Sequence, residues 1–278
     1  MIYKFIIYKI RLRIKLYIYS NNSRFFYKIN NSLNELRIPF YVLNYGVKLK
    51  NIKGIILTTQ KEFDGISSEN LKNRFLIYQD TQDFEEYIMH VLAAHKFNFK
   101  KRYLELIFSI DPGKNKSGIA IFLDEYFLIS KILHNQREFV DYIGKFISYF
   151  NSDKLKPIII KIFFGIGVPS LVESLLEVLS RKFKEFMPIF YLVDERNTSK
   201  MKYDKHIFKI SKHEISAIWI ATRGIKAIKS MNILNSNEED SQSEFPKKLN
   251  SEIKFDFNLA KNVYFGNSSI SEALNFKQ

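Results

Sequence analysis

The stretch that decides the fold runs Leu104-Glu105-Leu106-Ile107-Phe108-Ser109-Ile110-Asp111-Pro112-Gly113-Lys114-Asn115-Lys116-Ser117-Gly118-Ile119-Ala120-Ile121-Phe122. Its first apolar run predicts a buried strand, Asp111-Pro112-Gly113 predicts a tight turn, and the run that begins at Ser117 predicts a second strand. A third apolar run, Phe127–Leu133, follows after a short polar break. Three strands joined by tight turns predict an antiparallel meander.

Helical and strand patterns alternate after this meander. The predicted elements are a helix containing Phe139, Ile143, Phe146 and Ile147, the strand Pro157–Phe164, the helix Ser170–Phe183, the strand Ile189–Val193 and the helix Lys212–Ile228. The resulting order, βββαβαβα, is that of the ribonuclease H fold. We therefore expect an α/β protein whose main domain, residues 104–230, has a mixed five-stranded sheet.

The regions on either side of this domain have different patterns. Residues 1–99 alternate apolar runs with helical spacing and predict a small α/β domain. Its expected strands and helices are Arg13–Tyr19, Ser23–Arg37, Phe40–Asn44, Ile52–Thr58, Arg74–Gln79 and Asp83–His95. Residues 231–278 are polar and predict a flexible tail, within which Ile253–Phe265 regains aromatic residues and is a candidate to dock on the body.

The charge balance favours a polyanionic partner. Lys and Arg number 43 against 29 acids, a net charge of +14, which points to nucleic acid before a membrane surface, with a merely solvated basic surface as the alternative. The chain has no cysteine, which excludes disulfides and thiolate metal sites. Five Lys and Arg residues interrupt the apolar stretch Met1–Tyr19, so we expect a strand there, no membrane span and a cytoplasmic protein.

The first hairpin carries a resemblance to known nucleases. The segment Ser109-Ile110-Asp111-Pro112-Gly113 with Ser117-Gly118 resembles the RuvC and YqgF resolvase-type families, whose first strand ends in Asp-x-Gly before a short turn and a Gly. Two alternatives remain. Asp-Pro-Gly also forms the reverse turn of an ordinary hairpin, and the actin-like ATPase fold opens with a comparable phosphate-binding hairpin, although it needs two such domains.

A second match follows the strand Ile189–Val193. The segment Asp194-Glu195-Arg196-Asn197-Thr198-Ser199 resembles the Asp-Glu-Arg-x-Thr-Ser signature of the YqgF family. Successive strand residues point to opposite faces, so only one of Asp194 and Glu195 is expected to face the site. The alternative is an acid pair that caps a helix, with Arg196 as its partner.

The third match opens the last predicted helix. Lys212-His213-Glu214-Ile215-Ser216-Ala217 is similar to the family segment in which an Asp precedes a run of small residues, and here His213 takes the acid position beside Glu214. The alternative is a solvent-facing helix start that Glu214 stabilises through the macrodipole. We expect Ile215, Ile218, Trp219 and Thr222 to pack on the sheet and so carry this helix start toward Asp111.

The chain departs from RuvC on the strand Pro157–Phe164. RuvC resolvases place a catalytic Glu there, and the only charge in this chain is Lys161. YqgF proteins also lack that Glu and continue into a glycine-rich turn, as Gly165-Ile166-Gly167-Val168-Pro169-Ser170 does here, whose amides are candidates to hold a phosphate. The resemblance is therefore closer to YqgF.

The resemblance implies a metal-dependent endonuclease that cleaves branched DNA or structured RNA with two Mg²⁺ or Mn²⁺ ions. Its expected metal ligands are Asp111, Asp194, Glu195 and His213, with His213 or Glu214 orienting the water. The expected nucleic-acid contacts are Lys114, Lys116, Lys200, Lys202 and Arg223. The alternative is a catalytically degraded nucleic-acid-binding protein of the same fold, and a homodimer is one candidate assembly.

Overall fold

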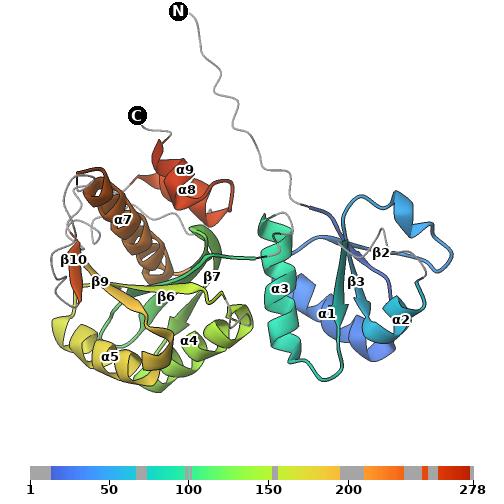
Figure 1. Ribbon diagram of the computed structural model, residues 1–278, viewed down its shortest axis with the longest axis horizontal. Helices are drawn as coiled ribbons and strands as arrows, with labels where there is room; N and C mark the ends of the chain where they lie inside the picture. Colours follow the sequence, from blue (N-terminus) through green and yellow to red (C-terminus); the bar gives the residue numbers. More distant parts are fainter. Residues whose placement is uncertain are drawn as a thin grey trace, which may run out of the picture. The chain divides into compact units, whose positions relative to one another are not determined.

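The computed structural model describes residues 14–66, 74–97, 100, 102–151, 156–194, 210–234, 246–249 and 256–275. The chain divides into two compact units, Met1–Lys101 and Arg102–Gln278. Each unit has its own sheet (Figure 1).

The first unit is a parallel α/β sheet. Its strands β1 (Leu16–Ile18), β2 (Phe40–Val42), β3 (Ile55–Thr59) and β4 (Phe75–Tyr78) lie in the order β2-β1-β3-β4, with every pairing parallel. The helices are α1 (Ser23–Glu35), α2 (Gln60–Asp64) and α3 (Phe84–Phe97), with a short 3-10 helix, η1, at Leu49–Asn51. All four strands and the helices α1 and α3 overlap the segments that the sequence predicts, with β3 and α3 ending one and two residues later than predicted, whereas the short helix α2 is not among the predicted elements.

The second unit has a mixed sheet of six strands. They are β5 (Glu105–Asp111), β6 (Ser117–Leu123), β7 (Tyr126–Leu133), β8 (Ile159–Gly165), β9 (Ile189–Val193) and β10 (Lys247–Leu249), in the order β10-β9-β8-β5-β6-β7. β6 is antiparallel to β5 and β7, and β8, β9 and β10 continue the sheet in parallel with β5. The first five strands have the predicted order, and the arrangement is compatible with a ribonuclease H-like fold.

Helices cover both faces of this sheet. α4 (Gln136–Phe150) and α5 (Pro169–Lys182) lie on one face and α7 (Lys212–Leu234) lies on the other (Figure 1). α5 follows the carboxyl end of β8 and leads back to the start of β9, with the 3-10 helix η3 (Lys184–Phe186) between them. This alternation puts the carboxyl ends of β5, β8 and β9 at one edge of the sheet, and the start of α7 reaches the same edge.

The expectation of a five-stranded sheet with a flexible tail is corrected by the carboxyl-terminal residues. The tail supplies the sixth strand, β10, and two helices, α8 (Phe257–Tyr264) and α9 (Ile270–Asn275), which lie against α7 (Figure 1). Leu259, Val263 and Ile270 are at most 4% exposed. These apolar residues, although sparse in a polar sequence, bury enough surface to dock the segment.

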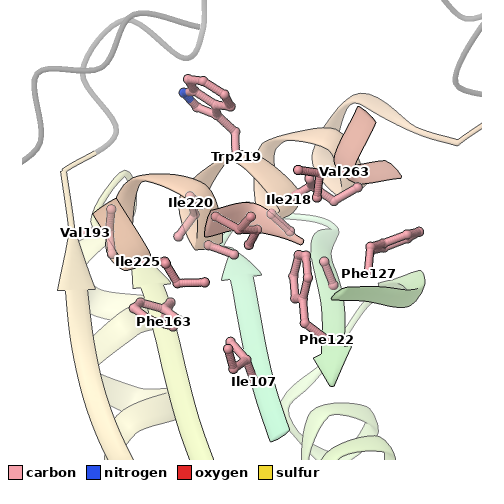
Figure 2. Packing of buried hydrophobic residues seen from close by; sticks show 14 of the residues in the cluster. Ile107, Phe122, Phe127, Phe163, Val193, Ile218, Trp219, Ile220, Ile225 and Val263 are labelled. Carbon is pink, nitrogen blue, oxygen red and sulfur yellow. The ribbon is translucent and has the colours of Figure 1, made fainter. Parts of the chain in front are cut away.

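Helix α7 is buried on more than one side. Ile215, Ile218 and Thr222 are fully buried, as expected for residues that pack on the sheet. Trp219 is also fully buried, but its side chain projects from α7 away from the strands (Figure 2). A helix that packs between a sheet and a second layer is apolar all round, so its sequence pattern did not show which side faces the sheet.

Candidate functional site

Asp111 and His213 meet at the carboxyl edge of the six-stranded sheet. Asp111 is the last residue of β5 and His213 is the second residue of α7. Nδ1 of His213 lies 2.8 Å from Oδ2 of Asp111, which is a hydrogen-bond distance. The carboxylate is nearly enclosed, with 11% of its side chain exposed, whereas 35% of the imidazole is exposed. The pair therefore has a buried acid behind a solvent-accessible ring.

Two glycines let α7 approach the hairpin this closely. Asp111 pairs with Gly118 across the β5–β6 ladder, and a Cβ on Gly118 would lie 2.1 Å from the carbonyl oxygen of His213. A Cβ on Gly113 would lie 3.2 Å from Cε1 of His213 and 2.3 Å from the carbonyl oxygen of Lys116. The backbone of α7 thus rests directly on glycine backbone, because a side chain at Gly118 would occupy the same space.

The surroundings of Asp111 oppose its ionisation overall. Burial raises the pKa of Asp111, and the hydrogen bond and charge of His213 together with the charge of Lys212 only partly lower it. When Nδ1 of His213 donates to the carboxylate, Nε2 of the ring is left as a proton acceptor. An imidazole oriented in this way by a buried carboxylate can serve as a general base or a hydrogen-bond partner for a ligand.

Glu214, predicted as a catalytic residue, is engaged in capping α7. The backbone N–H of Ser211 donates to Oε2 of Glu214 at 2.8 Å, and the backbone N–H of Glu214 donates to Oγ of Ser211 at 3.2 Å. These two bonds form a capping box. Oγ of Ser130 on β7 donates to the other carboxylate oxygen at 2.8 Å. Both oxygens are bonded within the protein, so the structure favours a helix-stabilising role for Glu214, although this residue is buried and not solvent-facing.

Asp194 lies at the same edge of the sheet as Asp111, but two strands away. Ile110 pairs with Phe164, and Phe164 pairs with Leu192, so Asp111 is level with Val193 across the intervening strand β8. Two strand spacings separate β5 from β9 by about 10 Å. The parallel placement of these strands confirms the expected topology. The described residues bring His213, and not Asp194, into contact with Asp111.

The prediction of Arg223 as a nucleic-acid contact is corrected. Arg223 is only 3% exposed, and its Nη1 donates to the backbone carbonyl of Asp194 at 2.7 Å. A guanidinium must be accessible to contact a phosphate. In this structure Arg223 instead ties the end of β9 to α7.

The expected metal site is incomplete among the described residues. Within that part of the chain, no group of three or more His, Asp and Glu side chains lies close enough to hold a metal ion. A two-metal site needs several converging oxygen ligands, and Asp111 shares one of its oxygens with His213. These residues alone do not fit a pair of Mg²⁺ or Mn²⁺ ions. The predicted site residues Glu195, Lys200 and Lys202 lie outside the described residues.

Exposed lysines flank the Asp111–His213 pair. Lys114 and Lys116 lie in the β5–β6 turn and are exposed, as predicted, and Gly113 of the same turn packs beside the His213 ring. Lys212, which precedes His213, is also exposed, and its charge acts on Asp111. Sequence reasoning did not name Lys212 as a binding residue. The signal in the sequence was that Lys212 directly precedes His213, the residue predicted to take the acid position.

No protein-family model matches the chain, and no curated protein matches it by sequence. Among solved structures it is similar to Thermus thermophilus RuvC, at 13% identity over 62% of this chain and 95% of that chain, with a TM-score of 0.25. T. thermophilus RuvC in complex with Holliday junction substrate matches at 12% identity with the same coverage and a TM-score of 0.24. The MID-PIWI domains of N. crassa QDE-2 AGO match at 11% identity over 93% of this chain and 97% of that chain, with a TM-score of 0.28. The fold assignment rests on the strand order and directions described above.

The strand β8 bears no acid at this edge. Its one charged residue, Lys161, forms an ion pair with Glu105 of β5 at 2.5 Å, at the opposite end of the strand from Gly165. α5 then begins with Pro169, and its cap residue Val168 makes no side-chain capping bond. The role of the Gly165–Ser170 turn in holding a phosphate stays a prediction. In the described part of the chain, no helix is long and apolar enough to cross a membrane.

Proposed function

We propose that the second unit binds nucleic acid at the carboxyl edge of its six-stranded sheet. The observation that carries the proposal is the set of exposed lysines at this edge: Lys212 directly precedes His213, and Lys114 and Lys116 lie in the β5–β6 turn whose Gly113 packs beside the His213 ring. Three lysines beside an acid that is itself bonded to an imidazole leave the cluster net positive. A phosphodiester backbone is the polyanion that best suits such a cluster on a protein of net charge +14.

Branched DNA or structured RNA is the proposed ligand class, and the proposed family relationship is to YqgF more than to RuvC. The lack of an acid on β8 and the glycine-rich turn that follows it support this relationship. The ring of His213 is a partly exposed polar group beside these lysines. It is therefore the group that we expect to meet the ligand beside the lysines.

The test is equilibrium binding of the full chain to a four-way DNA junction, a matched duplex and an RNA hairpin across a range of salt concentrations. Replacing Lys114, Lys116 and Lys212 together with Gln should weaken binding and reduce the slope of log affinity against log salt by about two to three, at about 0.9 per phosphate contact on duplex.

Arg181, Lys182 and Lys184 provide a matched control for charge. They are exposed at the end of α5 and in η3, where the chain has returned to the opposite edge of the sheet. Replacing all three with Gln removes the same charge and should leave the slope nearly unchanged. An equal effect of the two triple variants would reduce the proposal to a general charge effect, and no binding at low salt would overturn it.

A metal-dependent endonuclease is the second candidate function. The parallel strands β5, β8 and β9 bring Asp111 and Asp194 to one edge, and Glu195 follows Asp194 in the sequence, which favours this candidate. The described residues do not complete the two-metal site, so this candidate depends on a carboxylate from Glu195. Incubation of junction, flap, hairpin and hybrid substrates with Mg²⁺ or Mn²⁺ tests it, because cleavage must require the metal and must be lost in Asp111→Asn.

A further inference from the structure

The first unit exposes a group of large apolar residues at and just after its edge strand β2. Four residues between positions 41 and 47 are large, apolar and exposed, namely Tyr41 (53%), Val42 (53%), Tyr45 (48%) and Val47 (39%). Elsewhere among the described residues, such exposed side chains are scattered singly along the sequence. Isolated exposed apolar residues are ordinary, whereas a contiguous group marks a binding surface.

Two stacked tyrosine pairs organise this surface. Tyr41 on the edge strand β2 stacks on Tyr17 of β1, directly opposite it, with ring centroids 5.3 Å apart. Tyr45 stacks on Tyr19 with centroids 4.7 Å apart. Tyr17 and Tyr19 are two residues apart in an extended segment, so the pairs follow one another along the sheet at about 7 Å. We call Tyr17, Tyr19, Tyr41 and Tyr45 the tyrosine surface.

The tyrosine surface is exposed because its cover is short. The connection from β2 to β3 crosses β1, and its helical part is the three-residue helix η1. The connection from β1 to β2, by contrast, contains the thirteen-residue helix α1. Leu49 and Ile52 of this connection pack with Tyr17 and Tyr19 on that face. Tyr41 lies beyond this cover, at the sheet edge.

Positive charge predominates around the tyrosine surface. From Ile14 to Asp64 the chain has eight Lys and Arg residues against three acids, Glu35, Glu62 and Asp64, and the carboxylate of Glu62 accepts a hydrogen bond from the Tyr45 hydroxyl at 3.0 Å. Nζ of Lys15 lies 5.7 Å from the centroid of the Tyr41 ring. Lys48, Lys50 and Lys53 are exposed on the connection that crosses the same face.

We propose that the tyrosine surface binds single-stranded nucleic acid, with bases stacking on Tyr41 and Tyr45 and phosphates meeting Lys15 and the lysines of the β2–β3 connection. Aromatic side chains within a positively charged surface are the arrangement by which proteins hold single strands without reading sequence. A second copy of this chain is a poorer occupant, because the same basic surface would then face itself.

Binding of the full chain to fluorescein-labelled oligo-dT and oligo-rU of twelve nucleotides tests this proposal. Tyr41→Ala should weaken binding about tenfold, the equivalent of one lost stacking contact, and Tyr41→Phe should restore it because the ring alone stacks. Tyr27→Ala is the matched control, since Tyr27 is a 68% exposed tyrosine on α1, outside the tyrosine surface. An oligonucleotide containing 5-iodouracil should crosslink to Tyr41 or Tyr45.

These measurements test the tyrosine surface independently of the function proposed for the second unit. Junction binding by the Lys114, Lys116 and Lys212 cluster should be unchanged in Tyr41→Ala. Equal single-strand binding by Tyr41→Ala and Tyr27→Ala, or crosslinks outside the tyrosine surface, would overturn the proposal and leave the lysine cluster untouched. If Tyr41→Ala instead dissociates a dimer in sedimentation, a second copy is the occupant and the proposal is wrong.

Discussion

Gly118 of β6 lies so close to His213 of α7 that a Cβ on the glycine would meet the histidine carbonyl oxygen at 2.1 Å. Gly118 is also the ladder partner of Asp111. One backbone contact therefore fixes the distance between the two residues of the candidate site. The glycine that follows the Asp-Pro-Gly turn is needed for this contact, and any larger residue must displace the start of α7.

Gly118→Ala should destabilise the second unit by about 1–3 kcal/mol, the usual range for a forced overlap in a packed interior. Thermal unfolding followed by fluorescence of Trp219, the one tryptophan of the chain, reports on this unit. Gly144→Ala is the control, because a Cβ there meets Phe183 at an ordinary 3.5 Å within helix α4. That change should stabilise by about 0.5–1 kcal/mol through helix propensity. A neutral Gly118→Ala would contradict the close packing.

Asp111→Asn should leave the fold intact and the unfolding temperature equal or higher. The protein holds the Asp111 carboxylate in a nearly enclosed position that raises its pKa, and the Asn amide oxygen can still accept a hydrogen bond from His213. A gain of about 1 kcal/mol would raise the melting temperature by about 2–4 °C. Junction binding should persist, and any metal-dependent cleavage should vanish. A large loss of stability would instead make Asp111 a structural residue.

Glu214→Ala should cost about 1–3 kcal/mol of stability, because it removes the capping box of α7 and leaves the Ser130 hydroxyl without its acceptor. Glu214→Gln keeps the acceptor oxygen and should recover part of this loss. Urea unfolding of both variants measures the difference. If Glu214→Gln retains stability but abolishes cleavage in an active preparation, the capping role is not its only role.

Glu62 should make the first unit sensitive to acid. Burial raises its pKa, but hydrogen bonds from Ser20, Thr59, Asn21 and Tyr45 outweigh burial and lower the pKa to about 2 from 4.5. The ionised form is thus favoured by folding, so this contribution to stability is complete above pH 4.5 and is lost as the pH falls toward 2. Glu62→Gln should reduce stability at neutral pH and flatten this dependence.

The first unit contains no tryptophan and tyrosines lie in both units, so peptide-resolved hydrogen exchange of the full chain is the measurement that follows the first unit by itself. Glu35→Gln, at the exposed end of α1, is the control for loss of one carboxylate. If wild type and Glu62→Gln lose stability in parallel between pH 5 and 2, the hydrogen bonds to Glu62 do not stabilise the first unit. These bonds join the ends of β1 and β3 to Tyr45, which supports the tyrosine surface.

The sequence predicted the parts of the fold that depend on local pattern. β8 lies between helices on both faces and is an apolar run interrupted by Lys161, and the β5–β6 hairpin is marked by Asp111-Pro112-Gly113. The contact of Asp111 with His213 followed from the order of the motifs. Ser211-x-x-Glu214 is itself a capping-box pattern, so the structural role of Glu214 was also readable from the residues.

The carboxyl-terminal elements could not be predicted because long-range contacts hold them. The backbone N–H of Ile270 donates to the carbonyl oxygen of Glu125 at 3.1 Å, across 145 residues of sequence. Tyr126 donates to Glu272 at 3.0 Å, and the ring of Phe127 packs on Tyr264. A local sequence pattern in a polar segment does not predict contacts with a hairpin that is so far away in the sequence. The same holds for the hydrogen bond from Arg223 to the backbone carbonyl of Asp194.

The strand registers give a testable prediction about the two acids that follow β9. Asp111 faces α7, as its contact with His213 requires, and Val193 is level with Asp111 and packs in the core beneath the same helix. Side chains alternate between faces along a strand, so we predict that, if this alternation continues past Val193, Asp194 points to the opposite face and Glu195, which lies outside the described residues, points to the face of Asp111. In the endonuclease candidate, Glu195→Gln should therefore reduce metal-dependent cleavage at least tenfold more than Asp194→Asn, a difference of about 1.4 kcal/mol in transition-state stabilisation. Single-turnover cleavage of the junction substrate measures both, with junction binding as the control for folding. Equal losses in the two variants, or a larger loss in Asp194→Asn, would show that the chain leaves the strand alternation at Val193 and that Asp194 is the second carboxylate.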